Sequence, residues 1–131
     1  MIVAVGIDMI ELARVRAVLE RHPRRFPERH FHARELADLE GRLDPVPGLA
    51  ARFAAKEAFQ KCWPETIGWR EVWVAKEGPR PRLAFAPGLA GAIAEQHLTV
   101  HVSLSHTREH AAAVVVLERP TAEVAAAAGG P

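Results

Sequence analysis

Apolar residues recur along the chain at two spacings, which predict strands in some segments and helices in others. Short apolar or alternating runs predict strands over 2–7, 72–75, 82–85, 99–105 and 111–117. Helical spacing predicts helices over 9–20, 34–42, 51–62 and 87–97. Irregular stretches at 22–33 and 44–48 predict loops. This order indicates an α+β fold, with a mainly antiparallel sheet wrapped around the long central helix over 51–62.

The chain of 131 residues is short enough for one domain, which we expect over 1–120. The remaining residues, 121–131, are rich in Ala and Gly and almost uncharged. Such a composition is typical of a flexible tail.

The central helix has one face of small residues. At 100° per residue, this face consists of Ala50, Ala54, Ala58 and Cys62. Small side chains let another element approach closely, so we expect this face to be buried. The opposite stripe contains Arg52, Lys56 and Gln60. We expect that stripe to face solvent.

Glu57 and Lys61 lie on the shoulder of the apolar face, where two interpretations are open. Four residues apart on a helix, they can form a surface ion pair that contributes about 0.2–0.5 kcal/mol. Alternatively, the carboxylate and the ammonium both point into a cleft. Periodicity alone favours the surface pair.

Composition excludes several classes of protein. The single Cys excludes a disulfide framework and a zinc site built from cysteines. A formal net charge of +1 excludes a globally basic nucleic-acid binder. The apolar start of the chain is interrupted by Asp8 and Glu11, and no run approaches the roughly 20 apolar residues of a membrane span. We therefore expect a cytoplasmic protein without a signal peptide, bound to neither nucleic acid nor a membrane.

Asp8 stands at the end of the first expected strand, two residues after Gly6. One interpretation is that Asp8 caps the following helix, which contributes about 1 kcal/mol. The other is that it binds a hard cation. Mg²⁺ needs only one or two protein carboxylates when phosphate oxygens and water complete its shell, and Asp8 and Glu57 together would meet that need.

The stretch 101–107 (His-Val-Ser-Leu-Ser-His-Thr) is a further candidate for chemistry. In a strand, His101, Ser103 and Ser105 share one face, which favours either a solvated surface or a binding surface. His106 then stands where the strand meets a polar loop that begins with Thr107. A ring in that position is suited to accompany an anion such as phosphate.

Taken together, these segments resemble the holo-acyl-carrier-protein synthase family of 4′-phosphopantetheinyl transferases. The resemblance rests on the motifs at 6–14, 52–61 and 101–107, which stand in the family's order and at about its spacing. It implies that Asp8 and Glu57 bind Mg²⁺, and that Asp8, Glu57 and Lys61 form the catalytic set, with Lys61 at the phosphate under attack. It also implies that coenzyme A is the co-substrate, held by Arg52, Lys56, Ser105, His106 and Thr107.

The resemblance further implies a protein substrate and an assembly. Seven arginines lie between positions 14 and 34, and acyl carrier proteins are small and acidic. The implied docking residues are Arg14, Val18, Arg21, Arg24 and Phe26. Members of the family assemble as homotrimers with active sites between subunits, so we expect the same here.

The chain departs from the family pattern in three places. Ala51 stands where Gly is common, the segment 62–70 is shorter and bulkier than usual, and the hairpin turn reads Gly-Pro-Arg-Pro at 78–81. These departures concern contacts with the pantetheine arm and adenine more than the metal site. Three tryptophans follow the central helix, at positions 63, 69 and 73. Packing is the favoured role for them, ahead of stacking on adenine.

Two other functions use the same residues. The first is another Mg²⁺-dependent phosphotransferase or hydrolase with the same Asp, Glu and Lys. The second is a non-catalytic module whose arginines dock an acidic protein, with Asp8 as a helix cap and Glu57–Lys61 as a surface pair.

Overall fold

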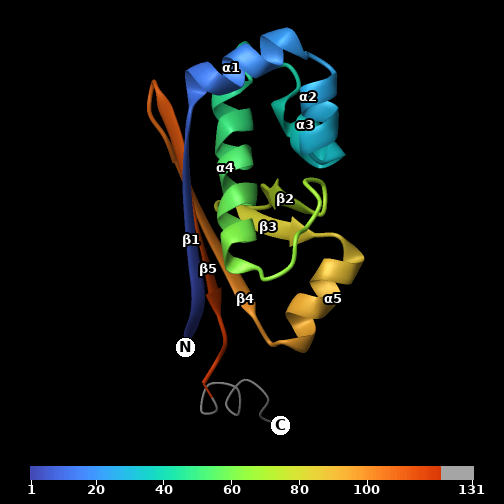
Figure 1. Cartoon of the computed structure of the whole chain (residues 1–131), viewed down its shortest axis with the longest axis vertical. Helices are drawn as coiled ribbons and strands as arrows, with labels where there is room; N and C mark the ends of the chain where they lie inside the picture. The colour runs from blue at the N-terminus through green and yellow to red at the C-terminus, as the bar shows by residue number, and fades with distance from the viewer. Residues whose placement is uncertain (122–131) are drawn as a thin grey trace.

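Five strands and five helices make up residues 1–121, the part of the chain that the computed structural model describes (Figure 1). The strands are β1 (Ile2–Glu11), β2 (Val72–Ala75), β3 (Arg82–Phe85), β4 (Thr99–His106) and β5 (His110–Glu118). The helices are α1 (Leu12–Arg21), α2 (Arg25–His30), α3 (Ala33–Leu39), α4 (Val46–Cys62) and α5 (Pro87–Glu95). The tail expected at 121–131 lies, apart from Thr121, outside the described residues.

The strands form two antiparallel sheets. One has three strands in the order β1-β5-β4, and the other is the β2-β3 hairpin. In the larger sheet Asp8 of β1 lies opposite Ala113 of β5, and Ala113 lies opposite Leu104 of β4. The α+β class and the antiparallel pairing predicted from the sequence are confirmed.

Helix α4 lies along one face of the three-stranded sheet, against β1 and β5 (Figure 1). The expected small face of the helix is confirmed for Ala50, Ala54 and Ala58, which are fully buried, whereas Cys62 is only half-buried. The closest approach is at Gly6 of β1, where an added Cβ would lie 2.0 Å from the backbone oxygen of Ala58. Because any larger residue at position 6 would collide with the helix backbone, glycine is required there by packing.

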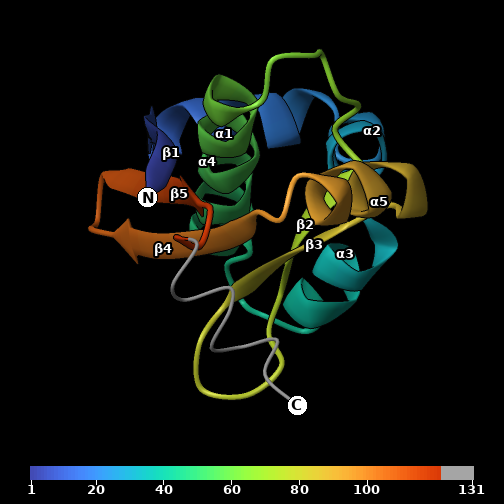
Figure 2. The same ribbon diagram turned by 90° about the horizontal axis from the view of Figure 1, so that it is seen from below.

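The opposite face of the larger sheet is not covered by any helix of the described residues (Figures 1 and 2). The β1 side chains on that face are apolar and exposed: Val5 at 60%, Ile7 at 62% and Met9 at 64%. On β4 the same face carries His101, Ser103 and Ser105, which are also exposed. Exposed apolar side chains gathered on one strand are typical of an interface.

The buried apolar residues form two clusters that meet along α4. The sheet cluster contains the second half of α4, the hairpin, α5 and the inner face of the larger sheet, with Phe59, Val74 and Val115 fully buried. The helical cluster joins α1, α2 and α3 to the first half of α4, around Val15 and Phe31. Ile10 packs against both clusters.

The structure differs from the predicted elements most clearly in three places, and α3 and α5 also end two or three residues earlier than predicted. Strand β1 continues to Glu11, where a helix was predicted from Met9, because its last residues still pair with β5. Helix α2 lies in a stretch predicted as a loop; Pro27 is tolerated there because it falls in the first turn. Helix α4 begins at Val46, and it includes Pro47 and Gly48, which were predicted to lie in a loop.

No helix among residues 1–121 is long and apolar enough to cross a membrane.

Candidate active site

Asp8 and Glu57 line one hollow in the surface, although they are far apart in the sequence. Asp8 comes from β1 and Glu57 from α4, and the two elements pack directly against each other. The hollow has a volume of about 420 Å³. It is called the main hollow below, and its lining consists of Asp8, Met9, Ile10, Arg14, Val15, Val18, Phe26, His30, Phe53 and Glu57.

Lys61 lies beside Asp8. Its Nζ donates a hydrogen bond to the backbone oxygen of Ile7 at 2.7 Å and lies 3.2 Å from Asp8 Oδ1. The surface ion pair between Glu57 and Lys61 does not form, since Lys61 pairs with Asp8 instead. Capping by Asp8 is also wrong, because Asp8 is within β1 and the residue before α1 is Glu11, which makes no side-chain cap.

The donor set of Asp8 and Glu57 fits Mg²⁺. The described residues contain no group of three or more His, Cys, Asp and Glu side chains that would enclose a metal ion by themselves. Mg²⁺ does not need such a group, because it commonly takes one or two carboxylates and fills its remaining positions with phosphate oxygens and water. Glu57 forms no ion pair or hydrogen bond with the rest of the described chain, so its carboxylate is free to bind a cation.

The predicted docking residues lie next to these carboxylates. Arg14, Val18 and Phe26 line the main hollow, and Arg21 and Arg24 are exposed at the adjoining ends of α1 and α2. None of the three arginines has an ion-pair partner among residues 1–121. Phe26 is only 7% exposed, so it contributes the floor of the surface and is not a protruding anchor.

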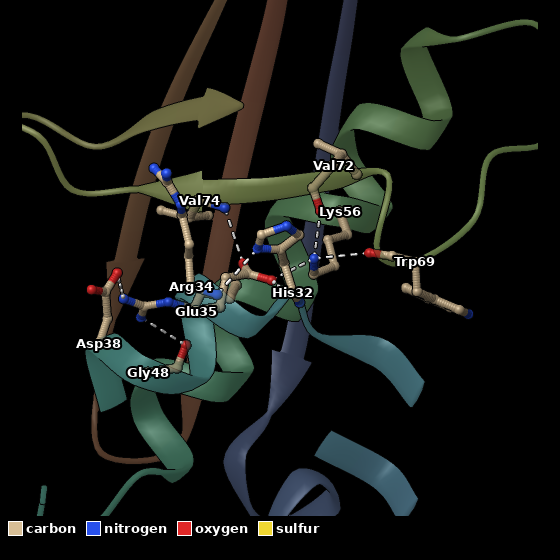
Figure 3. A network of polar contacts seen from close by, with 10 residues as sticks. His32, Arg34, Glu35, Asp38, Gly48, Lys56, Trp69, Val72 and Val74 are labelled. Carbon is tan, nitrogen blue, oxygen red and sulfur yellow. Dashed lines mark hydrogen bonds and ion pairs between the residues drawn. The ribbon is translucent and has the colours of Figure 1, made fainter. Parts of the chain in front are cut away.

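Lys56 departs from the solvent-facing stripe predicted for it. It is 2% exposed and pairs with Glu35 of α3, which is fully buried, at 2.6 Å (Figure 3). Its Nζ also donates to the backbone oxygens of Trp69 at 2.9 Å and Val72 at 2.5 Å. Burial lowers the pKa of Lys56, and the neighbouring Glu35 opposes that shift.

Glu35 uses both carboxylate oxygens. Oε1 accepts from the backbone N–H of His32 at 3.1 Å and meets Lys56, and Oε2 accepts from the N–H of Val74 at 3.0 Å. The pair therefore joins α3, α4 and β2 (Figure 3). Lys56 also lines a smaller hollow of about 160 Å³, together with Glu57 and Trp69. The contact between Lys56 and coenzyme A stays a prediction.

Arg52 is also buried, at 2% exposure, which the predicted solvent-facing stripe did not anticipate. Its Nη1 donates to the backbone oxygen of Gly48 at 3.2 Å, and its Nη2 lies 3.9 Å from Asp38 Oδ2. Nε and Nη2 make no hydrogen bond. Burial lowers the pKa of this guanidinium, with nearby Glu35 opposing the shift. Its proposed contact with coenzyme A remains a prediction.

Ser105 and His106 are the last two residues of β4, Thr107 begins the turn to β5, and all three are exposed. The Thr107 hydroxyl accepts from the backbone N–H groups of Glu109 and His110, which shapes the turn. None of the three lines the main hollow, because β5 separates β4 from β1. Within one chain, the structure therefore does not bring these residues to Asp8 and Glu57.

Sequence reasoning missed Glu35 and His30. A signal for Glu35 is present: it stands three residues after His32, and the two form a capping box at the start of α3. His30 lies in the wall of the main hollow, in a stretch predicted to be irregular. No pattern in the sequence distinguishes it from the other histidines nearby.

The tryptophans have packing roles, as favoured from the sequence. Trp63 is buried and stacks on Phe59 at a centroid distance of 5.7 Å. Trp69 stacks on Phe53 at 4.8 Å, and Trp73 stacks on His32 at 3.8 Å. Trp69 also lines the smaller hollow beside Glu57.

Comparison with known proteins shows the family of the chain. Residues 4–115 match the family described as the 4′-phosphopantetheinyl transferase superfamily. The chain is 58% identical to a holo-[acyl-carrier-protein] synthase of Thermus thermophilus, over 90% of this chain and 94% of that protein. It is 56% identical to the enzyme of the same name from Deinococcus radiodurans, over 90% of this chain and 94% of the relative.

Solved structures share the fold. The holo-[acyl-carrier-protein] synthase of Neisseria meningitidis superposes with a TM-score of 0.83 at 30% identity, over 91% of this chain and all of that one. The Bacillus anthracis enzyme, solved in complex with CoA (3′,5′-ADP), has a TM-score of 0.75 at 31% identity, over 92% of this chain and 99% of that one. The chain belongs to the 4′-phosphopantetheinyl transferase superfamily and, within it, to the holo-acyl-carrier-protein synthases.

Proposed function

We propose that the protein moves 4′-phosphopantetheine from coenzyme A to a serine of an apo-acyl carrier protein, in a Mg²⁺-dependent reaction that releases adenosine 3′,5′-bisphosphate. The activity would serve fatty acid biosynthesis in the cytoplasm. One observation carries the proposal: Asp8 and Glu57 converge on one hollow, which Arg14 and Val18 also line. The names of the relatives and the coenzyme A complex of the Bacillus anthracis enzyme support the substrates.

In this scheme Asp8 and Glu57 hold Mg²⁺ together. When bound, the ion supplies positive charge to the pyrophosphate oxygens, which gain negative charge in the transition state. Lys61 adds a second positive charge at the same place, because its Nζ already lies against Asp8. Most of the rate enhancement then comes from positioning and electrostatics, as in phosphoryl transfer in general.

Docking of the carrier protein is assigned to the surface beside the hollow. Arg14 and Arg21 on α1, and Arg24 just before α2, have no ion-pair partner among the described residues, which suits a negatively charged partner. Val18 lies between them and is half-buried, and Phe26 lies beneath. A carrier protein seated there would bring its serine to the rim of the hollow that holds Asp8 and Glu57.

The coenzyme A residues at the β4–β5 turn would act on a neighbouring subunit. Ser105, His106 and Thr107 are kept from the main hollow of their own chain by β5. In a homotrimer with active sites between subunits, they would instead complete the hollow of the next chain. The exposed apolar side chains of Val5, Ile7 and Met9 supply a surface for such an assembly.

The test is mass spectrometry of an apo-acyl carrier protein incubated with the protein, coenzyme A and Mg²⁺. We expect the carrier protein to gain the mass of one phosphopantetheine group, and the gain to disappear when a chelator replaces Mg²⁺. The same incubation with a nucleoside triphosphate in place of coenzyme A is the control. Absence of any mass gain with coenzyme A would contradict the proposal, and hydrolysis of the nucleotide would favour a different phosphotransferase.

A further inference from the structure

His30 stands between the two parts of the proposed site. It is the last residue of α2, and it lines the main hollow with Asp8 and Glu57. It also lines a hollow of about 160 Å³ that opens between α1 and α2. This hollow, called the second hollow below, is not the smaller hollow beside Lys56. Val18 and Phe26 line both the main hollow and the second hollow together with His30. A serine that arrives over Val18 and Phe26 therefore passes His30 before it reaches the phosphate.

The hydrogen bonding of His30 settles which ring nitrogen can accept a proton. Nδ1 lies 2.9 Å from the backbone oxygen of Phe26. A carbonyl oxygen only accepts, so Nδ1 must carry the hydrogen in the neutral ring, and Nε2 has the free lone pair. Nε2 makes no hydrogen bond with the described residues, and it is not among their buried unpaired polar atoms. It is therefore accessible to solvent.

Aromatic rings hold the imidazole in place. The ring centroid of His30 lies 5.0 Å from that of Phe26, 6.0 Å from that of Phe53 and 5.1 Å from that of Trp69. Phe53 in turn stacks on Trp69 at 4.8 Å. Packed on these sides and hydrogen-bonded at Nδ1, the ring has little freedom to turn, so Nε2 keeps its direction.

The charged groups around His30 have both signs. In the main hollow these are Asp8, Glu57 and Arg14, and in the second hollow they are His22, Arg25 and Arg29. No ion pair ties His30 to any of them. The neutral imidazole is the form that accepts a proton.

We propose that His30 is the general base of the transfer, with Nε2 accepting the proton of the attacking serine. The inference rests on the proposed function. The serine O–H bond breaks as its proton moves to Nε2, and a bond forms between the serine oxygen and the β-phosphorus of coenzyme A. The bond from that phosphorus to the bridging oxygen breaks, and its electron pair leaves with adenosine 3′,5′-bisphosphate. The imidazolium of His30 then returns its proton to water.

This assignment gives cation binding and proton acceptance to different residues, so that one carboxylate does not have to do both. In the proposed function, Asp8 and Glu57 bind a cation, and a carboxylate that donates its electrons to Mg²⁺ is a poorer proton acceptor. His30 is outside that pair, with a lone pair on Nε2 that no group of residues 1–121 uses. His30 lies on the docking side of the hollow, where the serine hydroxyl has to lose its proton.

The test is steady-state kinetics of His30→Gln with apo-acyl carrier protein, coenzyme A and Mg²⁺. We expect kcat to fall by about 10²–10⁴-fold, the usual contribution of a general base. The KM for coenzyme A should stay within about threefold, because His30 holds no part of that substrate in this scheme. The acidic limb of the pH–rate profile, which reports a histidine that must be neutral, should disappear.

His97→Asn is the matched control, because His97 is an exposed histidine at the end of α5 with a φ of 54°, a conformation that Asn adopts readily. It should leave both kcat and the pH profile unchanged. His30→Phe, which preserves the aromatic cluster, serves as a second variant in case the glutamine variant does not fold. A folded variant at position 30 that keeps kcat within threefold of the original, or keeps the acidic limb, would overturn the assignment. Absence of transfer by the unmodified protein would instead overturn the proposed function.

Discussion

Asp8 and Glu57 are held in different ways at the scale of single residues. Asp8 shares its Oδ1 with Lys61, which is anchored to the backbone oxygen of Ile7. Glu57 has no partner within the described chain, so nothing in the fold depends on its charge. A change at Glu57 can therefore test the chemistry without disturbing the structure.

Glu57→Gln should remove transfer while leaving the fold intact. The amide keeps the size of the side chain and loses the negative charge that attracts Mg²⁺. We expect kcat/KM to fall by about 10²–10³-fold, comparable to the loss of one electrostatic contact in other enzymes. The thermal unfolding midpoint should change by less than a few degrees. Glu95→Gln, at the exposed end of α5, is the control, and full activity of the Glu57 variant would contradict its role.

Gly6→Ala should destabilise the protein. The new Cβ would lie 2.0 Å from the Ala58 backbone oxygen and 2.9 Å from Cys62 Sγ, so β1 and α4 would have to separate. Overpacking of this kind costs about 1–3 kcal/mol, which urea unfolding would measure. Gly91→Ala is the matched control: Gly91 lies within α5 with open space around its Cβ position, and alanine there should stabilise the helix by about 0.5–1 kcal/mol. Equal stability of the two variants would contradict the packing constraint.

At the scale of elements, α3 begins with an unusual cap. His32 Nδ1 accepts from the backbone N–H of Arg34 at 3.1 Å, and its ring stacks on Trp73. Only the unprotonated nitrogen can accept that bond. Burial lowers the pKa of His32, and the neighbouring Glu35 opposes the shift without reversing it. The start of α3 is thus adapted to a neutral imidazole.

This cap predicts a pH-dependent stability. Since the pKa of His32 is lower in the folded state, the unfolded chain binds its proton first as the pH falls. The stabilisation is complete above the unfolded pKa of about 6.5 and is lost as the pH falls through the lower folded value. His32→Ser keeps a cap without a titrating ring. Thermal unfolding from pH 8 to 5 should therefore show a smaller loss of stability in the variant, and parallel curves would contradict this explanation.

The elements also show what the sequence could and could not predict. Regular periodicity was enough to predict that every strand and four of the helices exist, and the small face of α4 followed from it directly. The burial of Lys56 could not be predicted in this way, because its partner Glu35 stands on another helix, 21 residues earlier. Periodicity assigns a charged residue to solvent unless a distant group compensates its charge. The extension of β1 to Glu11 likewise depends on pairing with β5, a contact from the other end of the chain.

The candidate site could be predicted only in part from the sequence. Asp8, Glu57 and Lys61 were identified by the resemblance of their motifs, and the structure brings all three together. His30 could not be found, since its significance depends on the bond to Phe26 and on the rings of Phe53 and Trp69, which come from two other segments. Ser105, His106 and Thr107 stay predictions, because they do not meet the other residues within one chain.

At the scale of the whole molecule, the uncovered face of the larger sheet predicts an assembly. Ile7 is 62% exposed on β1, the strand at one edge of that face, and replacing it with Lys would place a charge in the proposed interface. We expect Ile7→Lys to sediment as a monomer and to lose transfer activity, because each site would lack its neighbouring chain. Leu43→Lys is the control, since Leu43 is fully exposed and lies away from this face. A trimeric Ile7 variant, or a monomeric unmodified protein at working concentration, would contradict the assembly.

The division of the interior into two clusters has a consequence for how such enzymes diverge. The residues proposed to recognise a carrier protein lie on α1 and α2, which pack into the helical cluster, whereas Glu57 and Lys61 lie on the half of α4 that belongs to the sheet cluster. Substitutions that change carrier-protein recognition then affect packing in the helical cluster and leave the sheet cluster unchanged. A lineage could adopt a new protein substrate while inheriting its phosphate chemistry intact, and grafting residues 12–26 from a relative, with His30 left in place, should transfer the preference alone.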